Sequence, residues 1–275
     1  MSAVSALASK RWLRLRRSDR CALCDHELAA GDEAIWDPVS RTVTCLGCDL
    51  GEAPVVEGQA GASAFREYER RRQRREQHAR DKLGGLGVLL ARVIDEPETT
   101  KAWQQGGAGE VRAGARLAKH LEGYAVNLLH DRRIPGHGNA NIDHLAIGPG
   151  GVTVIDTKTH RGKIRVDRMG GLFCARRSVL TIGGRDQTRL IDRVECQVDL
   201  VRTALSRVGE DQIDVRGAFC FPHVDGLPIL ARLSVRGIII DGPKRVAKLA
   251  RRPGPLHPET IDRIWSNLGH SFSEA

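Results

Sequence analysis

The sequence predicts an α/β (α+β) protein with one central mixed sheet flanked by helices, preceded by a small cysteine module. In the 275-residue chain, helical and strand patterns alternate from about residue 100 to the end. Four cysteines gather between 21 and 48, ahead of that alternation. Hydrophobic residues make up 41% of the chain, which is ordinary for a soluble protein, and no apolar run approaches the roughly 20 residues of a membrane span.

Composition divides the chain into four parts. Residues 1–20 are a basic arm, which we expect to be disordered, and 21–50 hold the cysteine module. A linker and a charged helix occupy 51–99, and the main domain occupies 100–275. The charged stretch from 65 to 84 is helix-prone but has no apolar stripe. It is therefore either a solvated connecting helix or a basic surface that contacts phosphates.

The main domain reads as alternating elements. The first helix should bury Val111, Ala115, Ala118 and Leu121, because these share one face. The second has a stripe of Leu190, Val194, Val198, Val201 and Leu205. The last begins near Pro258, buries Ile261, Ile264, Trp265 and Leu268, and should stop at Gly269. Strands are predicted at 125–131, 141–147, 152–158, 162–166, 213–221 and 235–240, and helices at 109–123, 190–205, 245–252 and 258–269.

The first four cysteines are spaced for a metal. Two C-x2-C pairs, Cys21 with Cys24 and Cys45 with Cys48, stand twenty residues apart. Four thiolates complete a closed tetrahedral site, which favours structural zinc in a zinc-ribbon-like module over an iron–sulfur centre or a redox pair. Such pairing indicates a reducing, cytoplasmic compartment. The other three cysteines, which lie in apolar patterns and should be buried thiols, are Cys174, Cys196 and Cys220.

The charge balance favours an anionic partner. Lys and Arg number 43 against 34 Asp and Glu, a formal net charge of +9. Four thiolates and one zinc ion would change this to about +7, so the protein stays basic. Nucleic acid is the usual partner of such a protein, although basicity alone is weak support.

An apolar hairpin carries charges that need compensation. If "GPGG" closes the hairpin, Ile147 faces Val152 and Asp143 falls opposite Asp156. Strand alternation puts Lys158 on the same face as both acids. Two opposed carboxylates suit Mg²⁺ or Mn²⁺, with the lysine placed to stabilise charge on a phosphate. The alternative is a hairpin with an exposed polar face.

Two further side chains are candidates for the same site. Glu110 would supply a third carboxylate, but an acid that opens a helix also complements the helix dipole. Gln197 is the polar member of an otherwise apolar stripe. It either finds a partner inside the core or reaches the site and orients water or phosphate. The sequence leaves both alternatives open.

Several of these motifs resemble those of the nuclease-related domain family. The resemblance covers roughly residues 100 to 240 and is densest in "NIDHLAIGPGGVTVIDTK", with "GE" at 109–110, "LLHDRRIPG" and "RGKI" around it. That family belongs to the restriction-endonuclease-like superfamily, whose PD-(D/E)XK signature is an Asp, then Asp or Glu, one residue, then Lys. By this resemblance Asp143, Asp156 and Lys158 fill the signature, Glu110 matches the acid of the first core helix, and Gln197 matches a later glutamine.

The resemblance implies a Mg²⁺-dependent nuclease that hydrolyses DNA phosphodiester bonds. Glu110, Asp143 and Asp156 would hold the ion. The DNA backbone would contact basic residues near the hairpin: Arg132, Arg133, Arg161 and Lys163. Two alternatives remain, a catalytically silent protein that binds nucleic acid, and an interaction protein that forms a homodimer or holds a protein partner through its zinc module.

Overall fold

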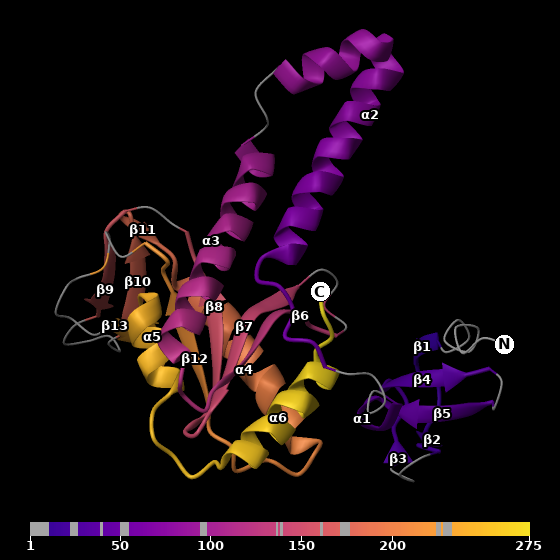
Figure 1. Cartoon of the computed structure of the whole chain (residues 1–275), viewed down its shortest axis with the longest axis vertical. Helices are drawn as coiled ribbons and strands as arrows, with labels where there is room; N and C mark the ends of the chain where they lie inside the picture. Colours follow the sequence, from indigo (N-terminus) through magenta and orange to yellow (C-terminus); the bar gives the residue numbers. More distant parts are fainter. Residues whose placement is uncertain are drawn as a thin grey trace.

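Figure 1 shows a cysteine module near the N-terminus, a long helical hairpin and a sheet domain. The sheet domain contains most of the buried apolar side chains. Among the helices described, none combines the length and apolar composition needed to cross a lipid bilayer. The computed structural model describes residues 11–22, 27–38, 41–49, 55–93, 98–135, 137, 140–159, 162–170, 177–223, 227 and 233–275.

The main sheet has six strands in the order β13-β14-β12-β8-β7-β6. β6, β7 and β8 form an antiparallel meander, β12 and β14 continue parallel to β8, and β13 returns antiparallel. The mixed central sheet that the alternating pattern predicts is thus confirmed. The strands are β6 (Asn127–Arg133), β7 (Asn141–Gly148), β8 (Gly151–Thr157), β12 (Val215–Cys220), β13 (Leu233–Val235) and β14 (Ile238–Asp241).

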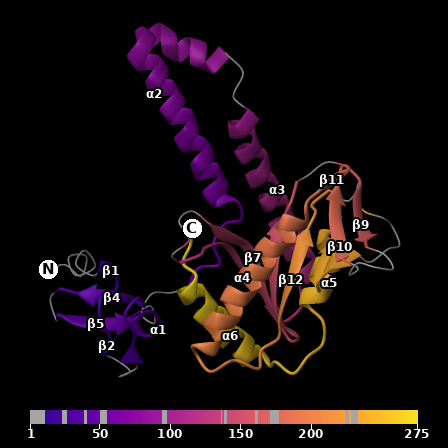
Figure 2. The same ribbon diagram turned by 180° about the vertical axis from the view of Figure 1, so that it is seen from behind.

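Helices cover both faces of this sheet. α3 (Glu98–Leu121) and α5 (Pro243–Ala250) pack on one face, which Figure 1 views, and α4 (Thr188–Ser206) and α6 (Pro258–Ser271) cover the other, which Figure 2 views. The α4 stripe is buried as predicted. In α6 the three predicted aliphatic residues are buried and Trp265 is half-buried, but the helix runs past Gly269.

The first core helix begins earlier than its sequence pattern suggests. α3 starts at Glu98, so Glu110 lies twelve residues inside the helix rather than in its first turn. An interior acid does not complement the dipole at the helix N-terminus. The predicted apolar face is also wrong except at Leu121, because Val111 is exposed and the buried face carries Ala113 and Leu117. Ala115 and Ala118 are exposed as well.

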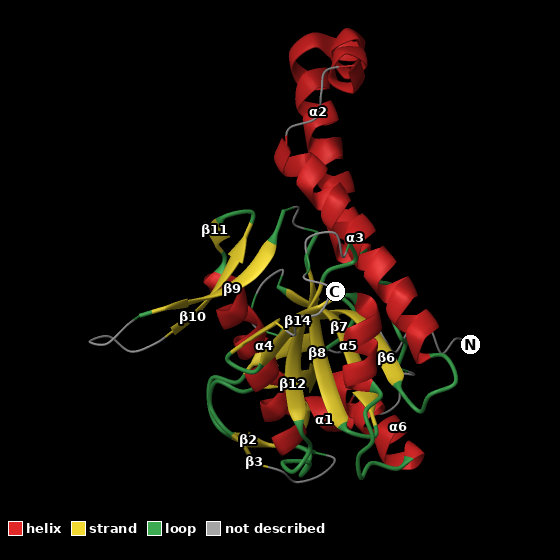
Figure 3. Cartoon of the chain, turned by 90° about the vertical axis from the view of Figure 1, so that its left-hand side faces the viewer, coloured by secondary structure: helices red, strands yellow, loops and turns green. Residues whose placement is uncertain are grey.

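The charged stretch is a helix, as predicted. α2 (Ala62–Val93) runs alongside α3 to form a hairpin that extends well beyond the sheet in Figure 3. Near its base the two helices approach closely, since a Cβ on Gly107 would lie 3.2 Å from both Ala64 and Phe65. Farther out, the Arg71 guanidinium lies 5.4 Å from the centre of the Trp103 ring.

Residues 55–61, expected to belong to a linker, pack against the edge of the main sheet. The amide of His130 donates to the carbonyl of Glu57 at 2.7 Å, and the Arg132 guanidinium donates to the Val56 carbonyl. Gly58 has a φ of +80°, and a Cβ there would lie 2.5 Å from the His130 carbonyl. This segment therefore acts as an extra edge along β6.

The sequence predicted only one strand of a second sheet. β9 (Ile164–Met169), β10 (Arg177–Ile182) and β11 (Arg185–Asp186) form an antiparallel sheet, of which only the first strand was expected. The strand predicted at 235–240 is also two strands. Arg236 and Gly237, with φ of 50° and 83°, form a turn between β13 and β14. Two consecutive residues with positive φ are typical of tight hairpin turns.

The cysteine module is built from short strands. Its three-stranded sheet has the order β1-β4-β5, formed by β1 (Arg11–Arg14), β4 (Glu33–Asp37) and β5 (Thr42–Cys45). The prediction of a disordered arm is wrong from residue 11 onward, because β1 pairs with β4. Residues 1–10 lie outside the described part of the chain. The remaining elements are β2 (Asp19–Arg20), β3 (Glu27–Leu28) and α1 (Leu46–Asp49).

Candidate active site

The predicted register of the charged hairpin is confirmed. Ile147 pairs with Val152 and His144 pairs with Ile155, so the next residues outward are Asp143 and Asp156. The Thr157 amide donates to the Asp143 carboxylate at 2.7 Å, which ties the two strands together at this end. Both aspartates are buried, at 8% and 5% exposure. The exposed-polar-face alternative is therefore wrong.

Lys158 supplies the positive charge nearest to these acids. Its Nζ lies 2.5 Å from the Asp156 carboxylate, and its side chain is 20% exposed. Burial alone would lower the pKa of this lysine, but the Asp156 and Asp143 carboxylates outweigh burial and raise it. The ammonium therefore stays charged and partly compensates the buried acids.

Glu110 reaches the same place from the interior of α3. Burial, followed by the charge of Asp143, raises the pKa of Glu110 to about 9. Burial, followed by the charge of Asp156, raises the pKa of Asp143 to about 7. One buried oxygen of Glu110, Oε2, has no hydrogen-bond partner. A cluster of buried acids with raised pKa values and a partnerless oxygen is typical of a functional site.

Gln197 approaches from the opposite face of the sheet. It is buried in α4, and its Nε2 donates to the carbonyl of Asn141 at 3.1 Å, at the start of β7. Its Oε1 is buried without a hydrogen-bond partner. Helices on both faces thus present polar side chains to the same end of the sheet. Glu110, Asp143, Asp156 and Lys158 are thus close enough to interact electrostatically, and Gln197 contacts the start of the strand that carries Asp143.

This group of residues has the chemistry to hold a divalent cation. Carboxylate and amide oxygens are the ligands that Mg²⁺ and Mn²⁺ prefer, and two of the buried oxygens, on Glu110 and Gln197, lack partners. A cation would also offset the repulsion that raises the pKa of Asp143. Among the described residues, however, only a cysteine cluster has three ligand atoms within 4.8 Å of one another. The three carboxylates are thus less tightly gathered than the cysteines.

A buried histidine pair lies behind the aspartates and was not predicted. His130 Nδ1 lies 2.8 Å from His144 Nδ1, and His144 Nε2 lies 3.1 Å from the Thr157 hydroxyl. Burial lowers the pKa of His130 to about 4 and that of His144 well below its ordinary value, so both rings are neutral at pH 7. The pair holds Thr157 between Asp156 and Lys158. Only the period-2 pattern of β7, which places His144 inward, could have indicated it.

Asp131 anchors the start of α2 beside the site. Its buried carboxylate accepts hydrogen bonds from the amide and hydroxyl of Ser63, at 2.5 and 2.6 Å, and from the Asn141 side chain at 2.6 Å. A carboxylate at a helix N-terminus satisfies amides that lack partners within the helix. The helical hairpin is therefore fixed to the sheet end that carries the acids.

The basic residues predicted to hold DNA have different environments. Arg132 is 2% exposed and donates to the Val56 carbonyl, so its predicted contact with DNA is wrong. A long cation that lies inside the fold cannot reach a phosphate. Arg133 and Lys163 are exposed. Arg161 lies outside the described residues.

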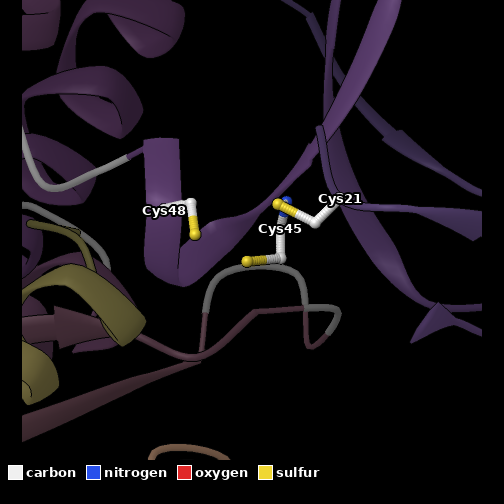
Figure 4. A group of neighbouring side chains, drawn as sticks. All are labelled: Cys21, Cys45 and Cys48. Atoms are coloured by element: carbon white, nitrogen blue, oxygen red, sulfur yellow. The ribbon is translucent and has the colours of Figure 1, made fainter. Parts of the chain in front are cut away.

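The cysteine cluster of the module is shown in Figure 4. The sulfurs of Cys21, Cys45 and Cys48 lie within 4.8 Å of one another, and Cys24 lies outside the described residues. The amide of Cys45 donates to Cys21 Sγ at 3.2 Å, a bond that favours a thiolate. Of the three later cysteines, Cys220 is buried as predicted, the prediction for Cys196 is wrong because it is exposed, and Cys174 lies outside the described residues.

Comparison with protein-family models matches residues 105–222 to the nuclease-related domain. The matched segment begins inside α3, five residues before Glu110, and ends just after β12. It therefore contains all five residues of the candidate site. No curated protein and no solved structure matches the chain.

Proposed function

Because residues 105–222 form a nuclease-related domain, we propose that this protein hydrolyses DNA phosphodiester bonds with Mg²⁺ or Mn²⁺. The observation that carries the proposal is the ion pair of Lys158 with Asp156 beside the buried Asp143, at a distance of 2.5 Å. Burying two adjacent acids destabilises a fold unless a cation compensates them. The partnerless oxygen of Glu110 supports a further positive charge at this place.

Each residue has a role in this proposal. Asp143 and Asp156, with the Thr157 carbonyl, would hold the ion, and Glu110 would join directly or through water. The bound ion would lower the pKa of a water molecule and polarise the scissile phosphate. Gln197, whose Oε1 lacks a hydrogen-bond partner, would orient that water or the phosphate.

Lys158 is the residue that handles developing charge. Its raised pKa keeps the ammonium protonated over the neutral range. The ammonium has three N–H donors and lies beside Asp156. It would hold the attacking water or neutralise charge on the phosphate in the transition state. The lysine therefore stabilises charge and does not act as the base.

The cysteine module has a structural role in the proposal. Four thiolates from Cys21, Cys24, Cys45 and Cys48 would close a zinc site and leave no position for a substrate. The hydrophobic core of such a small module is too small to stabilise its fold alone. Zinc would therefore supply much of its stability. Thiolates of this kind persist in a reducing compartment such as the cytoplasm.

A cleavage assay tests the proposal. Supercoiled, linear and single-stranded DNA are incubated with the full chain, with Mg²⁺, with Mn²⁺ or with no added cation. Asp156→Ala and Lys158→Ala serve as site variants after circular dichroism shows that they fold. We expect cation-dependent cutting by wild type only. Intact DNA under all conditions, with binding unchanged in all three proteins, supports the catalytically silent alternative instead.

A further inference from the structure

An exposed tryptophan on the cysteine module lies among exposed arginines. Trp12 is 51% exposed on β1, which leaves the face of its indole ring accessible to a ligand. Arg11, Arg16 and Arg17 are exposed, and within the described residues none makes an ion pair. An indole face beside several cations is the composition of a surface that binds nucleic acid.

Strand alternation gives this surface a defined face. Leu13 and Leu15 point into the small core of the module, so Trp12 and Arg14 point to the other face. Trp12 pairs with Ile35 across the sheet, and Ile35 is only 3% exposed. The indole therefore stands on the sheet, with one side against an apolar neighbour and the other in water.

Charge is distributed unevenly over the module. The stretch from 10 to 20 contains six Lys and Arg and one acidic residue, Asp19. Arg14 makes a 3.7 Å ion pair with Glu33, yet its side chain remains 67% exposed. β1 is an edge strand that pairs only with β4 among the described strands. Its outer edge is therefore not covered by another described strand of this sheet. The polyanion that complements it can lie along the strand.

We propose that this face, formed by Trp12 and Arg14 on β1 with Arg16 and Arg17 in the bend that follows, binds single-stranded nucleic acid by stacking a base on the indole. A duplex hides its base faces within the helix, whereas a single strand can turn one toward Trp12. The arginines contact the phosphates on either side of that base. This face lies on the cysteine module and does not include the carboxylate cluster. The proposal therefore does not depend on whether the chain cuts DNA.

Binding is measured by fluorescence anisotropy on the zinc-loaded full chain. An Asp156→Ala background without added Mg²⁺ keeps the probe intact, and no chelator is used because it would remove zinc. The probes are an oligothymidylate, its RNA equivalent and a hairpin duplex. We expect the single strands to bind at least ten-fold more tightly than the duplex. Preference for the DNA or the RNA strand identifies the natural ligand within this class.

Trp12 variants separate stacking from folding. Trp12→Leu keeps an apolar cover over Ile35 but cannot stack, and we expect it to weaken single-strand binding by about 5- to 100-fold. Trp12→Phe retains a ring and should restore most of the affinity. The matched control is Trp103→Leu, which removes another exposed indole, 40% exposed on α3, and should leave affinity unchanged. Equal affinity of wild type and Trp12→Leu, with zinc content intact, overturns the proposal.

Salt dependence tests the arginines. Replacing Arg16 and Arg17 with Gln should reduce the slope of log K against log salt by roughly 1.4, since each single-strand phosphate contact contributes about 0.7. The control pair is Lys119→Gln with Arg207→Gln, two exposed cations at the C-terminal ends of α3 and α4. If both pairs change the slope equally, binding follows net charge and the face on β1 has no special role.

Discussion

The raised pKa of Glu110 allows a test of the buried acid cluster that requires no substrate. Its pKa is raised from 4.5 to about 9, chiefly by burial and then by Asp143. A carboxyl whose pKa is higher in the folded state contributes full stability below pH 4.5. That contribution is lost as the pH rises toward 9, because the unfolded chain releases the proton more readily. Glu110 therefore destabilises the metal-free protein at neutral pH.

The substitution Glu110→Gln removes this effect. At pH 7 the carboxyl is ionised in the unfolded chain and protonated in the folded one, which disfavours folding by on the order of 3 kcal/mol. The variant should therefore be more stable than wild type at pH 7 without a divalent cation, and equal to it at pH 4. The two lowered histidine pKa values affect both proteins alike and cancel in the comparison.

Urea unfolding at pH 4, 5.5 and 7, without added Mg²⁺ but with zinc retained, measures the difference. Glu122→Gln is the matched control, because Glu122 is exposed just beyond the end of α3. It should leave stability unchanged at every pH. If Glu110→Gln is less stable than wild type by the same amount at pH 4 and pH 7, the carboxyl is a satisfied structural group and the reasoning fails.

Three other substitutions probe the site and its support. Lys158→Met should lower any cleavage rate by about 100-fold or more and destabilise the fold at pH 7 by about 3 kcal/mol; unchanged urea unfolding would contradict this. His144→Phe should reduce the loss of stability that wild type shows as the pH falls below 6.5, measured by thermal unfolding; an unchanged loss of stability at acid pH would exclude the histidine pair as its cause. Gly151→Ala, with φ of +110° and a Cβ position 2.2 Å from the Asp214 carbonyl, should cost about 2 kcal/mol more than Gly184→Ala, where nothing lies within 4 Å; equal losses would refute the close approach.

Local patterns were enough to predict the charged hairpin. A period-2 strand pattern on both sides of a Gly-rich turn fixes the register, so the sequence alone is enough to place Asp143 opposite Asp156. The same logic placed Lys158 on their face. Cysteine spacing likewise predicted the cluster of Cys21, Cys45 and Cys48. In the hairpin the determining contacts join residues linked by one turn, and in the module the paired cysteine spacing itself indicates a shared metal site.

The other features of the site depend on long-range packing, which the sequence patterns do not reveal. Nothing in the local sequence shows that the helix of Glu110 begins at Glu98, because α2 is what packs against its first turns. Arg132 looks like a surface arginine until the segment at 55–61 covers it. The histidine pair joins His130 and His144 across two strands, and α3 covers both rings at Gly114, where a Cβ would lie 3.7 and 3.5 Å from them. Such partners come from distant parts of the chain, where pattern and spacing carry no information.

The most direct test of the proposed nuclease activity is the cleavage rate of supercoiled DNA during a Mg²⁺ titration. We expect the wild-type rate to rise with Mg²⁺ and saturate, and Asp143→Asn to cut about 1000-fold more slowly. Asp262→Asn, which changes an exposed aspartate of α6, should match wild type. Cutting by Asp143→Asn at the wild-type rate, or cutting that does not depend on the cation, would contradict the proposed site.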